Sequence, residues 1–494
     1  MIRRTLRVAV WAAVFVLAGR AWTAETPNAP ASLDGKPAGA SKAFDDLVLY
    51  APGHFGNSYE AAGEAEMGAL LEEAKHWGFN RYADWFNMDD CVDPFPKSRV
   101  VKLSHAVWES KKRHFRAAMA RGLPCDLAIT PNHVYIDQCR PEWAAEQSDR
   151  IFGQLICPSK PEARQAILAN YENLFRDLAR SGVRLSAVVA APYDYGGCAC
   201  ARCQPWILTF AKLSREIHKL GLRYYPRLEM HMIGWWWQPA EHKEFAEWAD
   251  REAPDWIRRL YLWIPYGQTT VGQVPLPKGC QVAAFVHIGY GDLPGQERYF
   301  HLGPVIAPAR LEKTVADLKS RGCRSLMAYS EGVFDDVNKA LLAGLASGRF
   351  AKADDVLSAY AMRYLRAEEP PAAVQWARWL RAWGQPFQVN AEQAHAELTR
   401  LPGASAPVSW RREQWRLKCE LFRLHARIMQ GSNWTPQRLA LVDQFWATQE
   451  ELYRKVWGLG PVRHIFERRY TPLPWYQSWA KHQAELARGI GAQQ

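Results

Sequence analysis

The feature that most constrains the fold is an alternation that extends from residue 44 to about residue 350. Short apolar or β-branched runs take turns with amphipathic stretches of helical period. This alternation is typical of βα units that build a parallel sheet. We expect eight strands, near residues 46–52, 80–86, 125–130, 185–191, 223–232, 257–264, 281–288 and 324–329. Eight such units in about 300 residues fit a (β/α)8 TIM barrel.

The main alternative is a doubly wound open sheet. Nucleotide-binding members of that class carry a glycine-rich turn after the first strand, where the backbone approaches a pyrophosphate. Here the corresponding segment is His54-Phe55-Gly56-Asn57-Ser58, which lacks the required glycine spacing. The sequence therefore favours the α/β barrel, which we predict over residues 44–354 as the catalytic domain.

The strand pattern ends near residue 355, and helical periodicity replaces it. Thr435 followed by Pro436 predicts a helix N-cap with proline in the first turn. Residues 410–429 have the same amphipathic character as the stretch after Pro436. We therefore predict an all-helical C-terminal domain over residues 355–494.

The first 24 residues have the pattern of a signal peptide. A basic start is followed by an apolar run from Val8 to Gly19 and then by small residues. The run is short for a membrane span, and a simple N-terminal anchor is the alternative. Residues 25–43 are rich in Ala, Pro, Gly and Ser and predict a disordered lead-in. We expect a secreted or periplasmic protein that meets no membrane beyond its export signal.

The charge pattern argues against a nucleic-acid partner. The formal net charge is +11, but charges of both signs are interspersed and no block of Lys and Arg stands out. Such a balance is typical of a solvated surface.

Two segments that follow predicted strands place carboxylates beside aromatic residues and glycines. Asp194 follows the fourth strand, and Glu331 follows the eighth. Catalytic groups of TIM barrels lie at the C-terminal ends of strands, and glycosidic cleavage uses one carboxyl as acid and another as nucleophile or base. We predict that Asp194 and Glu331 are this pair, in an order that stays open. The alternative is that they orient loops or bind substrate hydroxyls.

Further polar and aromatic residues near strand ends are candidate substrate contacts. The chain has 23 Trp, most of which we assign to the core. Three adjacent Trp after the fifth strand are unusual for core alone, because neighbouring side chains point in different directions. Glu229 is a reserve carboxylate on the same strand face as His231, for which an interior histidine is the alternative. The predicted contacts are Asp84, Trp85, Asn132, His133, Tyr193, Glu229, His231, Trp235, Trp236, Trp237, Tyr290 and Asp335.

A cysteine cluster follows the fourth strand, at Cys198, Cys200 and Cys203. A structural zinc needs four ligands, so a fourth, such as His231 or Cys157, would come from elsewhere. Disulfides with distant cysteines are a second interpretation, because pairs so close in sequence would be strained. Free thiols that pack the loop are a third. We expect a structural role, and no cofactor that the catalysis requires.

The motif Asp194-Tyr-Gly-Gly-Cys198-Ala-Cys200-Ala-Arg-Cys203-Gln-Pro-Trp206 resembles a Cys-rich strand-four loop in a family of exported bacterial (β/α)8-barrel proteins of unknown function. That family is loosely similar to alpha-glucuronidases and beta-hexosaminidases. Residues 331–339 and 360–364 resemble the segments that follow its last strand. The resemblance covers about residues 45–370 and implies a barrel that hydrolyses glycosidic bonds.

Two departures from those enzymes matter. Hexosaminidases that use the substrate acetamido group carry an adjacent Asp-Glu pair after strand four, whereas Tyr195 follows Asp194 here. The glucuronidase pattern has Glu as its acid, where this chain has Asp. We predict a glycoside hydrolase with a carbohydrate substrate, acting on an extracellular or periplasmic glycan. A non-catalytic carbohydrate-binding barrel is the alternative, and a metal-dependent hydrolase or lyase is a third class.

Overall fold

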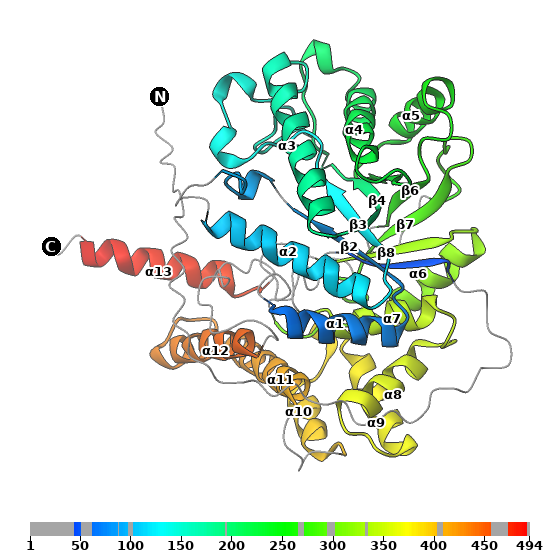
Figure 1. The fold of residues 1–494 in the computed structure, drawn as a ribbon. Helices are drawn as coiled ribbons and strands as arrows, with labels where there is room; N and C mark the ends of the chain where they lie inside the picture. Colours follow the sequence, from blue (N-terminus) through cyan, green and yellow to red (C-terminus); the bar gives the residue numbers. More distant parts are fainter. Residues whose placement is uncertain are drawn as a thin grey trace.

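The computed structural model describes residues 44–50, 62–86, 88–96, 102–192, 195–264, 271–293, 302–330, 334–402, 409–455 and 473–491. Within them, eight strands close into a barrel in chain order, from β1 to β8 (Figure 1). Every neighbouring pair is parallel, including β1 with β8. The predicted (β/α)8 TIM barrel is confirmed.

The strands are short and buried, as a barrel wall covered by helices requires. They are β1 Asp46–Tyr50, β2 Arg81–Trp85, β3 Cys125–Ile129, β4 Leu185–Ala190, β5 Glu229–Gly234, β6 Arg259–Ile264, β7 Gln281–His287 and β8 Ser325–Tyr329. The helices around them are α1 Glu64–Trp77, α2 Lys102–Ala120, α3 Pro161–Arg180, α4 Trp206–Leu222, α5 Pro239–Glu252, α6 Pro308–Ser320 and α7 Asp336–Ala346. Between β6 and β7 the described residues form no helix.

The fifth strand departs most from its expected bounds. The sequence predicts it over 223–232, whereas β5 begins at Glu229. Pro226 lies in the preceding turn, where the backbone N–H of Leu228 donates to the carbonyl of Tyr225 at 3.0 Å. Proline has no N–H for a strand ladder, so the strand begins only after it. Glu229 and His231 therefore lie at the N-terminal end of β5.

In the described residues after the barrel there are six α-helices: α8 Ala353–Tyr364, α9 Pro370–Ala382, α10 Ala391–Arg400, α11 Trp410–Met429, α12 Pro436–Arg454 and α13 Tyr476–Gly491. The expected cap of α12 is confirmed, since Thr435 Oγ1 accepts the backbone N–H of Arg438 at 3.2 Å. No helix in the described part of the chain has both the length and the apolar character that a bilayer crossing needs. The division into two domains at residue 354 stays a prediction.

The C-terminal helices contact the connections that follow β7 and β8. The carbonyl of Gly384 accepts the backbone N–H of Asp292 at 2.9 Å. Lys418 Nζ donates to the carbonyl of Pro304 at 2.8 Å, and the guanidinium of Arg411 pairs with Asp336 at 2.7 Å. The C-terminal helices therefore support one side of the barrel end at which β7 and β8 terminate.

Candidate active site

Aromatic side chains gather at the C-terminal ends of five strands. Tyr50 and Tyr329 are the last residues of β1 and β8, and their rings lie 6.1 Å apart and stacked. Phe285 of β7 lies 4.8 Å from Tyr329, centroid to centroid. This group, which we call the aromatic mouth, consists of Tyr50, Trp235, Trp263, Phe285, His287, Tyr290 and Tyr329. It lies at the barrel end where TIM-barrel active sites are built.

Trp235 lies at the centre of the aromatic mouth. Its ring centroid lies 5.3 Å from that of Trp263, 5.4 Å from Phe285, 5.2 Å from His287 and 5.5 Å from Tyr329. Trp235 and Trp263 are only partly buried. The two rings consequently keep surface that a ligand can cover.

His287 is held in one tautomer by its neighbour. The indole Nε1 of Trp263 lies 3.2 Å from Nε2 of His287, and an indole N–H can only donate. Nε2 is therefore the acceptor, and in the neutral ring the proton is on Nδ1. Burial lowers the pKa of His287 to about 3, with a further contribution from the charge of Arg310. The imidazole is neutral at physiological pH.

The loop after β7 is shaped by a buried arginine. Arg310, at the start of α6, donates to the carbonyls of His287 at 2.8 Å, Tyr290 at 2.7 Å and Gly291 at 3.0 Å. The ring of Tyr290 stacks on His287 with centroids 5.5 Å apart. Tyr290, a predicted contact, thus lies in the aromatic mouth, whereas Arg310 carried no sequence signal.

The three adjacent tryptophans separate. Trp236 has a left-handed backbone with φ of 57°, which is strained for a bulky residue, and its ring lies 6.2 Å from that of Phe152. Trp237 packs on Phe245 of α5 at 5.2 Å. The expectation that Trp237 lies at the mouth is wrong, because its side chain turns toward the surrounding helices. Trp235 lies in the aromatic mouth, and the ring of Trp236 lies 6.5 Å from that of Trp263, another member of the mouth.

Loops after β3, β4 and β5 are joined by an ion pair that sequence analysis missed. Arg150 pairs with Glu241 at 3.0 Å and donates to the carbonyl of Trp236 at 2.5 Å. Its guanidinium lies 3.7 Å from the ring centroid of Tyr195, whose hydroxyl bonds Glu241. Glu241 also accepts the backbone N–H of Gln238 at 2.7 Å in a capping box at the start of α5. That box was the signal that could have marked Glu241.

Asp335 lies at the N-cap position of α7 and is 1% exposed. Lys339 Nζ donates to its Oδ1 at 2.5 Å. Burial raises the pKa of Asp335, and the charge of Lys339 opposes that rise. The residue follows β8 as expected, but its carboxylate is engaged by its own helix.

Asp84 does not face the barrel interior. It is fully buried toward α2, where Lys111 Nζ lies 2.9 Å from Oδ1 and the Tyr82 hydroxyl lies 2.6 Å from Oδ2. Burial alone would raise the pKa of Asp84, but the charge of Lys111 and hydrogen bonds from His114 and Tyr82 bring it below its ordinary value. The expected place at the mouth is therefore wrong for Asp84. Trp85 is the last residue of β2 and is 8% exposed.

Asn132 and His133 are buried in the connection after β3. Asn132 Nδ2 donates to the carbonyls of Gly197 at 3.3 Å and Ile156 at 3.4 Å, which ties this connection to the loop after β4. His133 Nδ1 lies 3.0 Å from a carboxylate oxygen of Asp89. A groove of about 460 Å³ opens on the same connection, lined by residues between 139 and 156. Both side chains thus make internal contacts, and their roles as substrate contacts stay predictions.

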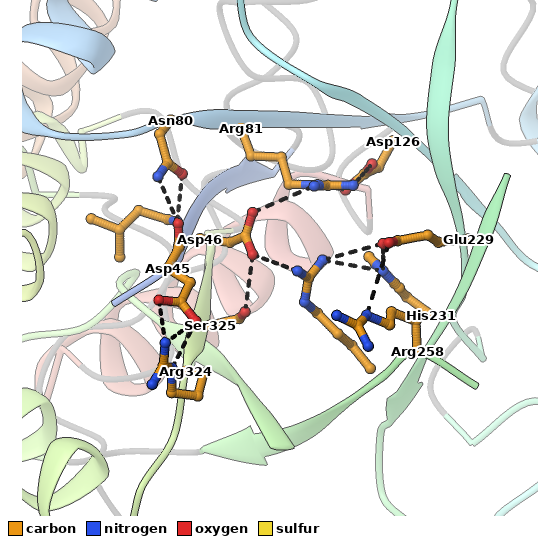
Figure 2. Close-up of polar contacts among 12 residues, drawn as sticks. Asp45, Asp46, Asn80, Arg81, Asp126, Glu229, His231, Arg258, Arg324 and Ser325 are labelled. Carbon is orange, nitrogen blue, oxygen red and sulfur yellow. Dashed lines mark hydrogen bonds and ion pairs between the residues drawn. The ribbon is translucent and has the colours of Figure 1, made fainter. Parts of the chain in front are cut away.

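Glu229 and His231 belong to a charged layer at the opposite, N-terminal end of the barrel (Figure 2). Arg81 binds Asp126 with two hydrogen bonds of 2.6 and 2.8 Å, and Arg259 Nη2 lies 2.6 Å from Asp46. Glu229 Oε2 lies 3.0 Å from Nε2 of His231. The expectation that Glu229 is a reserve catalytic carboxylate is wrong in location, because β5 begins at this residue.

Burial lowers the pKa of His231, and its Nε2 lies 3.0 Å from Glu229 Oε2 and 3.2 Å from Nη1 of Arg259. The hydrogen bond between His231 and Glu229 is the largest cause that lowers the pKa of Glu229 to about 2. Burial opposes it, and the charges of His231, Arg259 and Arg81 assist it. This layer is an internal ion-pair network of the barrel.

Four cysteines meet beside the loop after β4. The Sγ atoms of Cys157, Cys198, Cys200 and Cys203 all lie within 4.8 Å of one another. Cys157 precedes α3, so it joins the three cysteines of the motif from another connection. The group is the one set of metal-ligating side chains of this kind that the described residues bring together.

The two predicted catalytic carboxylates, Asp194 and Glu331, lie outside the described residues, and so does Tyr193. Their segments follow β4 and β8, which end at Ala190 and Tyr329. The catalytic roles therefore stay predictions.

No family model matches the sequence, and no curated protein matches it. Solved structures that resemble the fold include a family 30, subfamily 8 xylanase from Clostridium acetobutylicum, at 12% identity, covering 60% of this chain and 71% of that chain with a TM-score of 0.39. A family 5 glycoside hydrolase from Streptomyces cattleya, in complex with Manb1-4GlcNAc, has 14% identity and a TM-score of 0.39. The match covers 73% of this chain and 92% of that chain.

Dihydrodipicolinate synthase from Agrobacterium tumefaciens also resembles the fold, with 11% identity and a TM-score of 0.33. The match covers 82% of this chain and 98% of that chain. The structural neighbours thus include glycoside hydrolases, at identities near one residue in ten. At this distance the likeness concerns the fold alone, and the strand pairing itself defines the barrel.

Proposed function

We propose that the protein is a glycoside hydrolase that acts on an extracellular or periplasmic glycan. The observation that carries the proposal is the aromatic mouth, with partly buried Trp235 and Trp263 at the C-terminal ends of β5 and β6. Aromatic faces are electron-rich, and the C–H groups on a sugar ring face are weakly positive and apolar. A sugar ring can therefore stack there without losing hydrogen bonds from its hydroxyls.

Asp194 and Glu331 would supply the chemistry. One, protonated, donates its proton to the glycosidic oxygen as the bond to the anomeric carbon breaks. The other attacks that carbon, or takes a proton from the water that does so. Neutral His287, with its proton on Nδ1, would offer a hydrogen bond and no charge. The reaction requires no cofactor in this proposal, so chelators should leave its chemical step intact.

The test is hydrolysis of a glycan library by the wild type, Asp194→Asn and Glu331→Gln. We expect a loss of at least about 10³-fold in kcat for each variant, the scale of general acid–base catalysis. Glu247→Gln on the outer face of α5, where the side chain is 63% exposed, is the matched control and should keep full activity. Full turnover by both the Asp194→Asn and the Glu331→Gln variants would overturn the assignment of the pair.

A non-catalytic carbohydrate-binding barrel is the second candidate. The described carboxylates near the mouth are engaged, Asp335 by Lys339 and Asp292 by the backbone N–H of Arg310 at 2.9 Å, which favours it. Calorimetry would then show glycan binding that survives both Asp194→Asn and Glu331→Gln, without hydrolysis by the wild type.

We further propose that residues 1–24 direct export and are removed. Expression of the full chain in a Gram-negative host should yield protein in the periplasm or medium. Its N-terminus, read by mass spectrometry, should lie near residue 25. Full-length protein retained in the cytoplasm would contradict export.

A further inference from the structure

The four thiols of Cys157, Cys198, Cys200 and Cys203 have the spacing of a metal tetrahedron. Zn–S bonds are about 2.3 Å, so two sulfurs on one tetrahedral zinc lie about 3.8 Å apart. Cys157 Sγ lies 3.8 Å from that of Cys200 and 3.7 Å from that of Cys203. A disulfide would need about 2.05 Å. The separations fit thiolates around a shared ion and exceed any bond between sulfurs.

The groups around the sulfurs suit thiolates. The backbone N–H of Glu146 donates to Cys198 Sγ at 3.4 Å. Ser159 Oγ lies 3.0 Å from Cys157 Sγ and 3.6 Å from Cys200 Sγ. Donors of this kind stabilise negative charge on ligand sulfurs and hold them in place.

The burial of the four cysteines favours a structural role for a bound metal ion over a catalytic one. Cys157, Cys198 and Cys203 are buried, and Cys200 is partly buried. A catalytic zinc keeps one position open for water or substrate, whereas four protein sulfurs fill a tetrahedral shell. The cluster also joins two connections, because Cys157 precedes α3 and the other three precede α4.

We propose that Cys157, Cys198, Cys200 and Cys203 bind one structural zinc ion, which links the β3–α3 connection to the β4–α4 connection. The opposing account is disulfide formation, which an oxidising compartment favours. The ion would add a cross-link between two loops that the bond from Asn132 to the carbonyl of Gly197 already joins.

The primary test is metal analysis of the full chain, purified without chelator. We expect about one zinc per chain, released when a mercurial reagent titrates the thiols. Cys157→Ser should lower zinc affinity by more than about tenfold, since loss of a second-shell partner alone costs at least that much. Cys280→Ser, at a cysteine outside the cluster, is the matched control and should keep its zinc.

A second measurement does not depend on how the variants fold. Wild-type protein loaded with cobalt in place of zinc should show the visible absorption bands of tetrahedral thiolate coordination. Metal-free protein in which non-reducing peptide mapping finds a disulfide between any two of the four cysteines would overturn the proposal. Four free thiols with no bound zinc or cobalt would overturn it equally.

Discussion

The indole Nε1 of Trp263 donates to Nε2 of His287 across 3.2 Å, which joins the C-terminal ends of β6 and β7. The bond sets the imidazole tautomer and holds two rings of the aromatic mouth in fixed relation. Because His287 is buried, its Nε2 has no easy access to water if the donor is lost.

Trp263→Phe removes this donor while it keeps an aromatic ring. An unsatisfied buried acceptor costs about 1–3 kcal/mol, so we expect the free energy of unfolding to fall by that amount. Urea denaturation followed by circular dichroism measures it. The matched control is Trp256→Phe, which removes the bond of 3.2 Å to the ring of His218 outside the aromatic mouth. It should cost similar stability without affecting glycan binding. An unchanged urea midpoint for Trp263→Phe would contradict the bond.

Trp235→Ala removes the central ring of the aromatic mouth. We expect KM or Kd for the glycan to rise about tenfold, equivalent to about 1.4 kcal/mol, with a smaller rise for Trp235→Phe. Initial-rate kinetics or calorimetry measures it. Trp237→Phe, on the helix side, serves as the control. Equal effects from the Trp235 and Trp237 variants would show that the mouth does not bind the sugar.

Asp84→Asn breaks the buried pair with Lys111. Removal of one partner of such a pair costs about 3–5 kcal/mol, and we expect that loss in the free energy of unfolding. Asp84→Asn with Lys111→Met should recover much of it, because the uncompensated charge is gone. A stable Asp84→Asn variant with impaired glycan binding would instead restore Asp84 to the substrate site.

The ionisation of Glu229 makes the stability of the folded chain depend on pH. Its pKa is about 2 in the folded chain and near 4.5 when unfolded. It therefore contributes stability that is present above about pH 4.5 and is lost as the pH falls toward 2. Thermal unfolding of wild type and Glu229→Gln from pH 6 to pH 2.5 should show two curves that converge at the acid end. Parallel curves would mean that the ion-pair layer does not hold Glu229 ionised.

The sequence analysis predicted the barrel correctly because eight strands that alternate with helices are compatible with few other folds. It predicted Asp84 poorly for a physical reason. A barrel strand is buried on both faces, so alternation of side chains does not tell lumen from helix side. Lys111 and His114, one turn apart on α2, became its partners only through the packing of α2 on β2.

Position along a strand was the second difficulty. Tyr224, Tyr225 and Leu228 predict an extension of β5 toward its N-terminus, and with that extension Glu229 falls near the C-terminal end of the strand. Pro226 was the local signal against it. Contacts across distant loops, such as Arg150 with Glu241, left little trace in the sequence. Cys157 was one of two candidates for a fourth ligand, and geometry favours it over His231, which lies in the charged layer with Glu229.

The contacts from Gly384, Lys418 and Arg411 to the β7 and β8 connections have a practical consequence. A truncation after α7 would strip the carbonyl of Pro304, the amide of Asp292 and the carboxylate of Asp336 of their partners. Water would then have to satisfy these three groups at that side of the barrel end. The C-terminal helices are therefore part of the structural support of the aromatic mouth. Variants with altered barrel loops should be compared only in proteins that retain these helices.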